Sequence, residues 1–380
     1  MEKPKQEDKS DKGKRSLHTK TEQIKLLEDE LKNTKYNKRT QGAVGILKAK
    51  IAKLREDEEK RSSSGKKGEG YTVRKSGDGT AILIGFPSVG KSTLLNALTN
   101  AESKTASYAF TTLTCIPGTL QYNSAKIQIL DVPGILRGAA RGLGRGKEVI
   151  SVVRNADLVI FIVDVFDIKQ LEVLKKELYD ANMRVNERKP DVKLKKDSKG
   201  GIRVASTVKL TQLDDKTIKA VMTEMKMNNA TIVIREDITV DQLIDCIEDN
   251  KKYIPAIVVL NKIDMVDSAA LEKVKKHIGE CIPVSAEKGE NIDLLKEEIF
   301  TKLDFLRIYM KEVGQKPDLD VPLIMKTGCT IKMVCEKIHK DFVPRFKFAK
   351  IWGKSAKFPG QKLMLEHVLR DGDIIELHLR

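Results

Sequence analysis

The sequence predicts an α/β protein with several modules arranged around one mostly parallel β-sheet. Three observations predict this class. Apolar strands and amphipathic helices alternate from Thr80 onward, which is typical of a parallel sheet with helices on both faces. Two helical repeats precede this region, and a new strand and helix pattern follows residue 303. With 380 residues the chain is long enough for several compact units, each with its own core.

The N-terminal region is predicted to be a helical hairpin between two polar segments. Residues 1–20 are polar and expected to be disordered. Residues 61–79 are rich in Ser, Gly and Lys and predict a linker. Between them, residues 21–60 hold two amphipathic repeats joined by a short turn. The apolar positions of these repeats are Ile24, Leu27, Leu31, Val44, Leu47, Ile51 and Leu54.

The central domain is predicted to consist of residues 80–166 and 251–302, with an insert between them. Strands are expected at 81–84, 126–130, 158–163, 256–260 and 282–284. The stretch between Asp164 and Ala256 is too long for a single helical crossover. Residues 167–250 are therefore expected to form a small α+β insert, with a helix at 171–179, a basic loop KLKKDSKGG, a strand TIVIRED and a helix at 241–247.

The C-terminal residues 303–380 predict a small β-grasp, ubiquitin-like module. VPLIM resembles a strand, TIKMVCEKIHKDF an amphipathic helix and FKFAKIWG a second strand, and RDGDIIELHL suggests a turn feeding a closing strand. A strand, a helix and later strands within so short a segment are typical of this module.

Charge is concentrated at the two ends of the chain. The net charge is +16; residues 1–75 hold 22 basic against 13 acidic side chains, and residues 312–380 hold 13 against 9. Basic ends around a near-neutral centre suggest contact with a polyanion, although they also keep a chain in solution. In residues 337–357 lysines and arginines alternate with aromatic rings, so the ends are predicted to bind RNA.

The sequence favours a cytoplasmic protein with no membrane segment. No apolar run reaches the ~18 residues that a membrane span needs. The polar start MEKPKQEDKS lacks the apolar core of a secretory signal. The five cysteines are scattered with no CxxC pair, which suits a reduced compartment and gives little support for metal binding.

The first chemical motif is GFPSVGKS, which spans Gly85 to Ser92 after an apolar strand and before a helix. A glycine-rich loop in this setting points backbone N–H groups at phosphates, and the helix adds its positive N-terminal end. Lys91 is predicted to reach the β- and γ-phosphates, and the Ser92 hydroxyl to bind magnesium. The predicted nucleotide-binding residues of this stretch are Gly85, Phe86, Pro87, Ser88, Val89, Gly90, Lys91, Ser92 and Thr93.

Two further motifs are predicted to sense the γ-phosphate. In YAFTTLTCIPG a threonine hydroxyl can enter the magnesium shell when the loop closes; Thr112 is the candidate and Thr111 the alternative. In DVPG the Asp131 carboxylate is expected to orient that shell, and the Gly134 N–H to bond the γ-phosphate. Taken alone, each motif also fits an ordinary strand or turn. Magnesium is thus assigned to Ser92, Thr112 and Asp131, catalysis to Lys91, Thr112 and Gly134, and further nucleotide contacts to Val132, Pro133 and Ile135.

The last two motifs, NKID and SAEKG, are predicted to select the base. The Asp264 carboxylate can accept hydrogen bonds from guanine, whereas adenine would leave it unpaired, a mismatch that can discriminate by ~10⁴–10⁵. Lys262 can lie over the base, and the Ala286 N–H can meet the guanine oxygen. The predicted residues are Asn261, Lys262, Ile263, Asp264, Ser285 and Ala286. Five motifs in this order, each after a strand, predict a P-loop GTPase domain that binds GTP and GDP rather than ATP.

These motifs, GFPSVGKSTLLN, FTTLTCIPG, DVPG and NKID, resemble those of the Obg-related GTPases. From about Leu26 to Arg380 the chain is similar to the developmentally regulated GTP-binding protein family, more to its second eukaryotic branch than to its first. The resemblance implies a helical hairpin, a GTPase domain, an insert like a domain of a small-subunit ribosomal protein and a terminal TGS module. It also implies GTP hydrolysis, ribosome association and a regulatory partner protein that forms a heterodimer with the GTPase.

The sequence predicts slow hydrolysis unless another agent stimulates it. Ile135 stands where Ras-like proteins have the glutamine that orients water, and Arg137 and Ala109 replace acidic residues expected from the family. Potassium near Ser88, or a partner that orders the glycine-rich segment from Gly138 to Gly146, is the expected stimulus. An arginine finger from Arg137, Arg141 or Arg145 is the internal alternative. The competing class is a nucleotide-gated RNA or ribosome adaptor with incidental hydrolysis.

Overall fold

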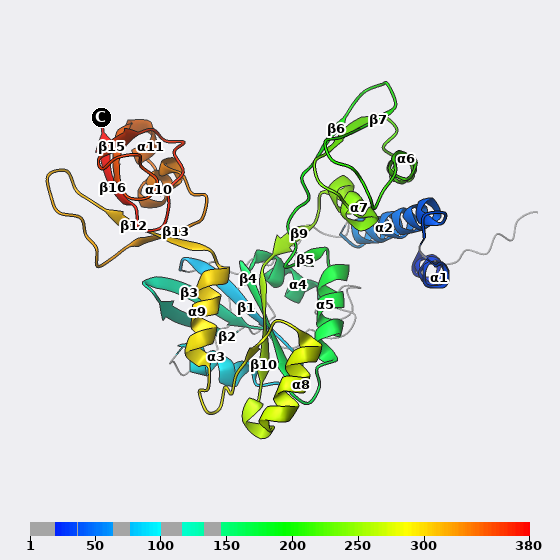
Figure 1. The fold of residues 1–380 in the computed structure, drawn as a ribbon, viewed down its shortest axis with the longest axis horizontal. Coiled ribbons are helices and arrows are strands. Elements are labelled where there is room, and N and C mark those ends of the chain that lie inside the picture. Colours follow the sequence, from blue (N-terminus) through cyan, green and yellow to red (C-terminus); the bar gives the residue numbers. More distant parts are fainter. Residues whose placement is uncertain (1–19, 36, 64–76, 100–115, 133–145) are drawn as a thin grey trace, which may run out of the picture. The chain divides into compact units, whose positions relative to one another are not determined.

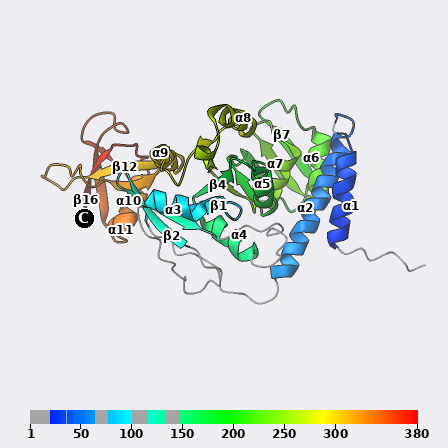
Figure 2. The same ribbon diagram turned by 90° about the horizontal axis from the view of Figure 1, so that it is seen from below.

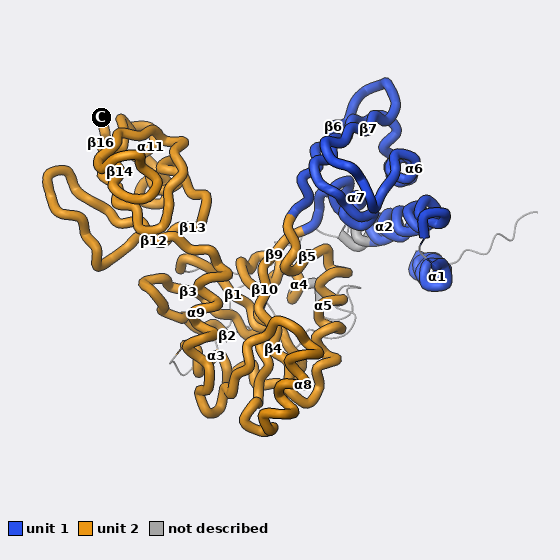
Figure 3. Tube along the Cα trace, in the orientation of Figure 1, with its two compact units in different colours: residues 1–69, 189–251 blue, residues 70–188, 252–380 orange. Residues whose placement is uncertain are grey.

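The computed structural model describes residues 20–35, 37–63, 77–99, 116–132 and 146–380. The chain divides into two compact units, and each is described by itself (Figure 3). The first unit consists of residues 1–69 and 189–251, and the second of residues 70–188 and 252–380.

The second unit contains a six-stranded sheet in the order β11-β10-β4-β1-β3-β2. All neighbouring strands are parallel except β2 and β3, which form an antiparallel pair at one edge. The strands are β1 (Gly79–Ile84), β2 (Ile116–Tyr122), β3 (Ala125–Asp131), β4 (Leu158–Asp164), β10 (Ala256–Asn261) and β11 (Ile282–Pro283). This arrangement confirms the predicted α/β class.

Helices cover both faces of this sheet (Figure 1). In β1, Ile82 and Ile84 pack in the apolar cluster of α4 and α5, whereas Ala81 and Leu83 pack in that of α3 and α9. Successive strand residues point to opposite faces, so a strand buried on both sides is apolar throughout. The helices are α3 (Lys91–Thr99), α4 (Gly146–Asn155), α5 (Gln170–Asp180), α8 (Ser268–Ile278) and α9 (Ile292–Lys302), with a 3₁₀ turn η2 (Ile263–Met265).

The C-terminal part of the second unit is a β-grasp module with its helix packed on a five-stranded sheet in the order β13-β12-β16-β14-β15. Strands β12 and β16 are parallel, and the other neighbours are antiparallel. The elements are β12 (Phe305–Met310), β13 (Leu323–Lys326), α10 (Ile331–Ile338), α11 (Phe342–Arg345), β14 (Phe346–Trp352), β15 (Gln361–Leu363) and β16 (Ile374–Leu379). The predicted module is confirmed.

The first unit joins the N-terminal hairpin to the insert. Helices α1 (Lys20–Asn33) and α2 (Gln41–Ser63) lie side by side (Figure 2), and ion pairs link Lys20 to Asp57 at 3.2 Å and Arg55 to Glu28 at 2.7 Å. Ala49 of α2 belongs to the apolar core of the insert. The insert has a sheet in the order β6-β8-β7 and two helices: β6 (Val192–Lys196), β7 (Ile202–Ser206), β8 (Ala230–Ile234), α6 (Asp215–Glu224) and α7 (Val240–Glu248).

The insert begins later than predicted. The helix expected at 171–179 is α5, and its buried Leu171, Leu174 and Leu178 pack on the large sheet rather than in the insert. The chain leaves that sheet's unit through β5 (Met183–Val185) and returns through β9 (Lys252–Ile254), which pair in parallel. The insert proper is therefore residues 189–251 and not 167–250.

Other expectations were wrong in detail. The basic segment KLKKDSKGG is not a loop throughout, because its first four residues lie in β6. Helix α2 continues to Ser63 and β1 starts at Gly79, so the predicted linker is shorter at both ends. The sequence analysis also missed the edge strand β2 and the first strand of the C-terminal module, β12. Within the described ranges, no helix has both the length and the apolar character needed to cross a bilayer.

Candidate nucleotide-binding site

Most of the predicted nucleotide-binding residues that the structure describes lie at one edge of the large sheet. Asp131 ends β3, Asp164 ends β4 and Asn261 ends β10, while the glycine-rich loop follows β1. The carboxyl ends of parallel strands meet at a common edge, which is where ligands bind in such sheets. The structure thus brings together residues that are far apart in the sequence.

The glycine-rich loop takes a conformation that depends on two glycines. Gly90 has a positive φ of 92°, and a Cβ there would lie 2.3 Å from Asn261 Nδ2. A Cβ on Gly85 would lie 2.6 Å from the carbonyl oxygen of Ile162. Side chains are therefore excluded at both positions, and the loop backbone lies close against β4 and Asn261. Val89 is buried beneath this loop, while Pro87 and Ser88 are exposed.

Lys91 points back across the loop at the start of α3. Its Nζ donates to the carbonyl oxygens of Gly85 at 3.1 Å and Phe86 at 3.0 Å. Burial lowers the pKa of Lys91, and the nearby Asp131 carboxylate partly offsets this effect. A partly desolvated ammonium held by two neutral carbonyls would gain from an anion placed beside it.

Ser92 and Asp131 form the candidate magnesium site. The Ser92 hydroxyl donates to Asp131 Oδ2 at 2.8 Å. The other oxygen, Asp131 Oδ1, is buried and has no hydrogen-bond partner among the described residues. Buried polar atoms are nearly always satisfied, so this oxygen is available to a ligand or its water. A hydroxyl and a carboxylate suit magnesium, which prefers oxygen ligands and retains several waters.

Asn261 connects the phosphate loop to the loop that follows β11. Its buried amide donates to the Val89 carbonyl at 2.8 Å and accepts from the Ala286 N–H at 3.0 Å. The motif NKID therefore contributes an internal brace as well as a base contact. Ala286 N–H, predicted to meet guanine, is bonded to this brace in the structure.

The residues predicted to contact the base are held by ion pairs and hydrogen bonds. Lys262, with a positive φ of 66°, forms an ion pair with Asp164 at 2.7 Å. Asp264 lies 3.9 Å from Lys288. A hydrogen bond from Ser285 lowers the pKa of Asp264, with a smaller contribution from Lys288. The carboxylate is thus kept charged and able to accept hydrogen bonds. The remaining member of this set, Ile263, starts the 3₁₀ turn η2.

Several predicted residues lie outside the described part of the chain. These are the switch candidates Thr111 and Thr112, the DVPG residues Pro133 and Gly134, and Ile135, Arg137 and Arg141, together with Ala109 and Arg145. Of the DVPG motif, the structure describes Asp131 and the buried Val132. Thr93 is exposed on the first turn of α3.

Sequence reasoning missed Asp164 and predicted Ser285 as a nucleotide-binding residue without its supporting role. Asp164 fixes Lys262, and Ser285 supports Asp264 while its Oγ also accepts from the Lys288 N–H at 3.2 Å. The position of Asp164 at the end of a buried strand was the available signal. A polar side chain directly after such a strand lies at the ligand-binding edge.

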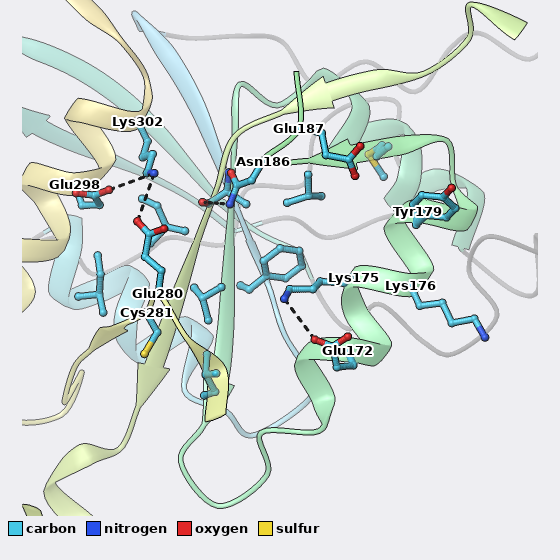
Figure 4. Close-up of a pocket in the computed structure, with 18 residues that line it drawn as sticks. Glu172, Lys175, Lys176, Tyr179, Asn186, Glu187, Glu280, Cys281, Glu298 and Lys302 are labelled. Atoms are coloured by element: carbon cyan, nitrogen blue, oxygen red, sulfur yellow. Dashed lines mark hydrogen bonds and ion pairs between the residues drawn. The ribbon is translucent and has the colours of Figure 1, made fainter. Parts of the chain in front are cut away.

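A pocket of about 620 Å³ lies elsewhere on the second unit, between α5 and strands β10 and β11 of the large sheet (Figure 4). Its three lysines stand against four glutamates, and two of the lysines are paired: Lys302 with Glu298 and Glu280, and Lys175 with Glu172. No residue of the five nucleotide motifs lines it. This pocket therefore gives no support for a second phosphate site.

The sheet, its glycine-rich loop and the C-terminal module define a P-loop GTPase fold with a TGS domain. Family models agree: one described as a 50S ribosome-binding GTPase matches residues 80–196, one for the C-terminal region of that domain matches 199–305, and the TGS model matches 306–379. The chain belongs to the developmentally regulated GTP-binding protein family, as its relatives show.

The chain is 54% identical to an uncharacterized GTP-binding protein of Methanocaldococcus jannaschii, over 94% of this chain and 93% of that protein. It is 42% identical to developmentally-regulated GTP-binding protein 1 of Xenopus laevis, over 93% and 97% of the two chains. It is also 42% identical to developmentally-regulated GTP-binding protein 2 of Bos taurus, over 94% and 98%. Because these last identities are equal, the assignment to the second eukaryotic branch stays a prediction.

Proposed function

We propose that this chain is a cytoplasmic, translation-associated GTPase that acts on or near the ribosome with a regulatory partner protein. The observation that carries the proposal is the convergence of Lys91, the Ser92–Asp131 pair and Asp264 at one edge of the sheet. These residues provide for a phosphate chain, a magnesium ion and a guanine base. The GTP-binding proteins to which the chain is similar and the TGS module support the same proposal.

Magnesium, when bound, neutralises charge on the β- and γ-phosphate oxygens. Ser92, Asp131 and Thr112 are the residues that would hold it. Within the described residues, no three His, Cys, Asp or Glu side chains cluster as a metal site of their own. This agrees with a site in which the protein supplies few ligands and the nucleotide supplies the others.

The chain's own residues bind and orient the nucleotide. Lys91 moves its ammonium from two loop carbonyls toward the phosphates, which are better partners for a desolvated cation. Asn261 keeps the phosphate loop and the Ala286 loop at a fixed separation. Asp264, held ionised, accepts from guanine. The protein thus contributes positioning and electrostatic stabilisation, which dominate phosphoryl-transfer catalysis.

The expected hydrolysis rate is slow, since the side chain of Ile135 has no polar atom with which to orient water. We propose that potassium or the partner protein stimulates turnover. The test is single-turnover GTP hydrolysis by the purified chain in matched potassium and sodium buffers, with Lys91→Ala as the inactive control. Faster hydrolysis in potassium supports the proposal. Equal rates in both salts, with the Arg137, Arg141 or Arg145 alanine variant inactive, would assign an arginine finger instead.

The second candidate, a nucleotide-gated adaptor with incidental hydrolysis, is favoured by the same Ile135. Co-sedimentation with ribosomes separates the two roles when a non-hydrolysable GTP analogue, GTP and GDP are compared with and without the partner. A GTPase cycle predicts that GTP is hydrolysed and the chain released. Stable association in GTP and in the analogue alike, with no turnover on the ribosome, would support the adaptor. Equal association in all three nucleotides would contradict both.

A further inference from the structure

The three-stranded sheet of the insert has one covered face and one open face. Val192 and Leu194 of β6 and Ile202 and Val204 of β7 pack toward the core that α2, α6 and α7 share with β8. Alternate residues of the same strands therefore point the other way. Those outward residues are Lys193 and Lys195 of β6, Arg203 and Ala205 of β7, and Thr231 and Val233 of β8.

The strand register gathers three cations on this open face. In the strand register, Lys195 of β6 and Arg203 of β7 lie opposite Thr231 of β8, one on each side. Lys193 lies opposite Val233, the next outward residue of β8. Neighbouring strands lie ~4.8 Å apart and alternate residues ~6.8 Å apart along a strand. Because β8 separates β6 from β7, the backbone positions of the three cations form a triangle with one side of ~6.8 Å along β6 and one of ~9.6 Å across the sheet; we call these three residues the basic face. Lys193, Lys195 and Arg203 are all exposed.

These three cations form no ion pair with the residues that the structure describes. Their neighbours behave differently: Lys189 pairs with Asp249 at 2.7 Å and Arg235 with Asp191 at 3.5 Å. The one acidic residue in the adjoining turn, Asp197, accepts a hydrogen bond from the Thr231 hydroxyl at 2.7 Å.

Charge in the insert is segregated. Residues 192–210 hold six Lys or Arg against Asp197 alone, although residues 189–251 as a whole hold 12 basic and 11 acidic residues. The insert is therefore almost neutral, with its positive charge concentrated on β6, β7 and the turn between them. Such a local field attracts a polyanion even where the total charge does not.

We propose that the basic face docks on the phosphate backbone of double-helical RNA. This inference deepens the proposed ribosome role and rests on it for the choice of RNA as the polyanion. The outward residues include no aromatic ring that could stack on an unpaired base, so single-stranded RNA has little to bind beyond its phosphates. They also lack the aromatic anchors of protein hot spots and the large apolar residues of membrane-surface helices.

The test measures binding of the full-length chain to a fluorescently labelled RNA duplex of about 16 base pairs. Fluorescence anisotropy gives the affinity at several salt concentrations. The variant K193Q/K195Q/R203Q neutralises the basic face. The variant K216Q/K219Q/K226Q removes the same charge from exposed positions on and just after α6, the helical side of the same unit. Far-ultraviolet circular dichroism checks that each variant folds, and K193R/K195R keeps the charge as a second comparison.

The basic-face variant is expected to bind the duplex at least ~10-fold more weakly, with a salt slope lower by about 2–3, because each lost phosphate contact removes about one released counterion. The α6 variant and the arginine variant should bind like the wild type. Equal weakening by both glutamine variants would mean a general charge effect and overturn the proposal. Unchanged duplex binding by the basic-face variant, or tighter wild-type binding to poly(U) than to the duplex, would overturn it as well.

GDP affinity measured on the same preparations separates this inference from the proposed function. The basic-face variant should bind GDP like the wild type, because its substitutions lie in the other unit from the nucleotide motifs. A wild-type chain that failed to bind GDP would sink the proposed GTPase while leaving the RNA result standing. A wild-type chain that bound GDP but not the duplex would sink the docking inference alone.

Discussion

At the scale of single residues, the nucleotide site depends on side chains that hold other side chains. Asn261 bonds to two loops, Asp164 fixes Lys262, and Ser285 supports Asp264. Each supporting residue is polar, and Asn261 and Ser285 are buried. A satisfied buried polar group specifies one arrangement of its neighbours, since any alternative leaves it unpaired.

Replacing Asp264 with Asn should shift base selection from guanine toward xanthine. The amide can donate where the carboxylate accepted, so it suits the altered edge of xanthine and leaves guanine mismatched. Buried mismatches of this kind can discriminate by ~10⁴–10⁵. Affinities for GDP and XDP measured by isothermal titration calorimetry check the expectation. The control is Asp293→Asn, an exposed carboxylate on α9. An Asp264→Asn variant that kept its preference for GDP would show that another group reads the base.

At the scale of elements, the close approach of α2 to α6 depends on a glycine. A Cβ on Gly45 would lie 3.1 Å from Thr217 Cγ2 and 3.2 Å from Val221 Cγ2, whereas a Cβ on Gly42 would be 3.7 Å from its nearest neighbour. We expect Gly45→Leu to lower the free energy of unfolding of the first unit by about 1–3 kcal/mol through overpacking. Gly42→Ala should not lower it, because alanine favours the helix.

Hydrogen exchange of the α6 amides measures this effect locally. Faster exchange in Gly45→Leu together with wild-type or slower exchange in Gly42→Ala is the expected pattern. Equal exchange in the wild type and Gly45→Leu would mean that α2 is not held against α6 in solution.

The sheet of the TGS domain contains a buried charge cluster. Glu376 is ion-paired with Lys311 and with Lys350 at 3.2 Å, and lies 2.7 Å from His378 Nε2. Burial raises the pKa of Glu376, but hydrogen bonds from Lys311, His378 and Lys350 outweigh it and lower the pKa from 4.5 to about 2. Lys311 also lies 4.7 Å from the centre of the Trp352 ring.

This cluster predicts an acid-sensitive TGS domain. Because the pKa of Glu376 is depressed in the folded state, its stabilisation is complete above about pH 4.5 and is lost as the pH falls toward about 2. In Glu376→Gln this loss should vanish, and stability at neutral pH should fall by about 2 kcal/mol as the cations lose their partner. Trp352 is the only tryptophan of the chain, so its fluorescence follows urea unfolding of this domain.

The exposed Glu366 provides the control for that measurement. Glu366→Gln should keep both the neutral stability and the acid-induced loss of the wild type. The same acid-induced loss in Glu376→Gln as in the wild type would show that other carboxylates cause it.

Local sequence patterns predicted the elements with strong apolar periodicity. They failed for elements whose structure or domain depends on the strand or core with which they pair or pack. The buried strands β1, β3, β4 and β10 were found because most of their residues are apolar. Strand β6 was taken for a loop, since four of the nine residues in KLKKDSKGG are lysines and only its register with β8 makes it a strand. Helix α5 was found, yet its assignment to the insert was wrong, because its apolar face packs in the core of the large sheet and an amphipathic pattern does not show which core a helix joins.

The nucleotide motifs were predictable for a related reason. Four of the five follow a strand of the large sheet, so a local pattern places their residues at the ligand-binding edge; YAFTTLTCIPG instead follows α3 and extends into β2 in the sequence. The supporting roles of Asp164 and Ser285 were not predictable in the same way, since they depend on contacts with Lys262 and Asp264 that only the folded chain makes.

At the scale of the whole molecule, the chain's two units are assembled from discontinuous segments. The N-terminal hairpin shares a core with residues 189–251, well over a hundred residues further along the chain. No local sequence pattern predicts a contact between segments so far apart. The sequence therefore predicted the hairpin and the insert as separate modules. In this division the nucleotide motifs and the TGS domain belong to one unit, and the basic face belongs to the other.

The nucleotide motifs at the edge of the large sheet are proposed to bind a guanine nucleotide. The most direct test of this proposal is the affinity of the full-length chain for GDP and for ADP, measured by isothermal titration calorimetry with magnesium present. We expect tight GDP binding and ADP binding weaker by about 10⁴-fold, because adenine leaves the Asp264 carboxylate unpaired. ADP affinity within about 10-fold of GDP affinity would contradict the assignment of Asp264 as the base-reading residue, and with it the proposed GTPase.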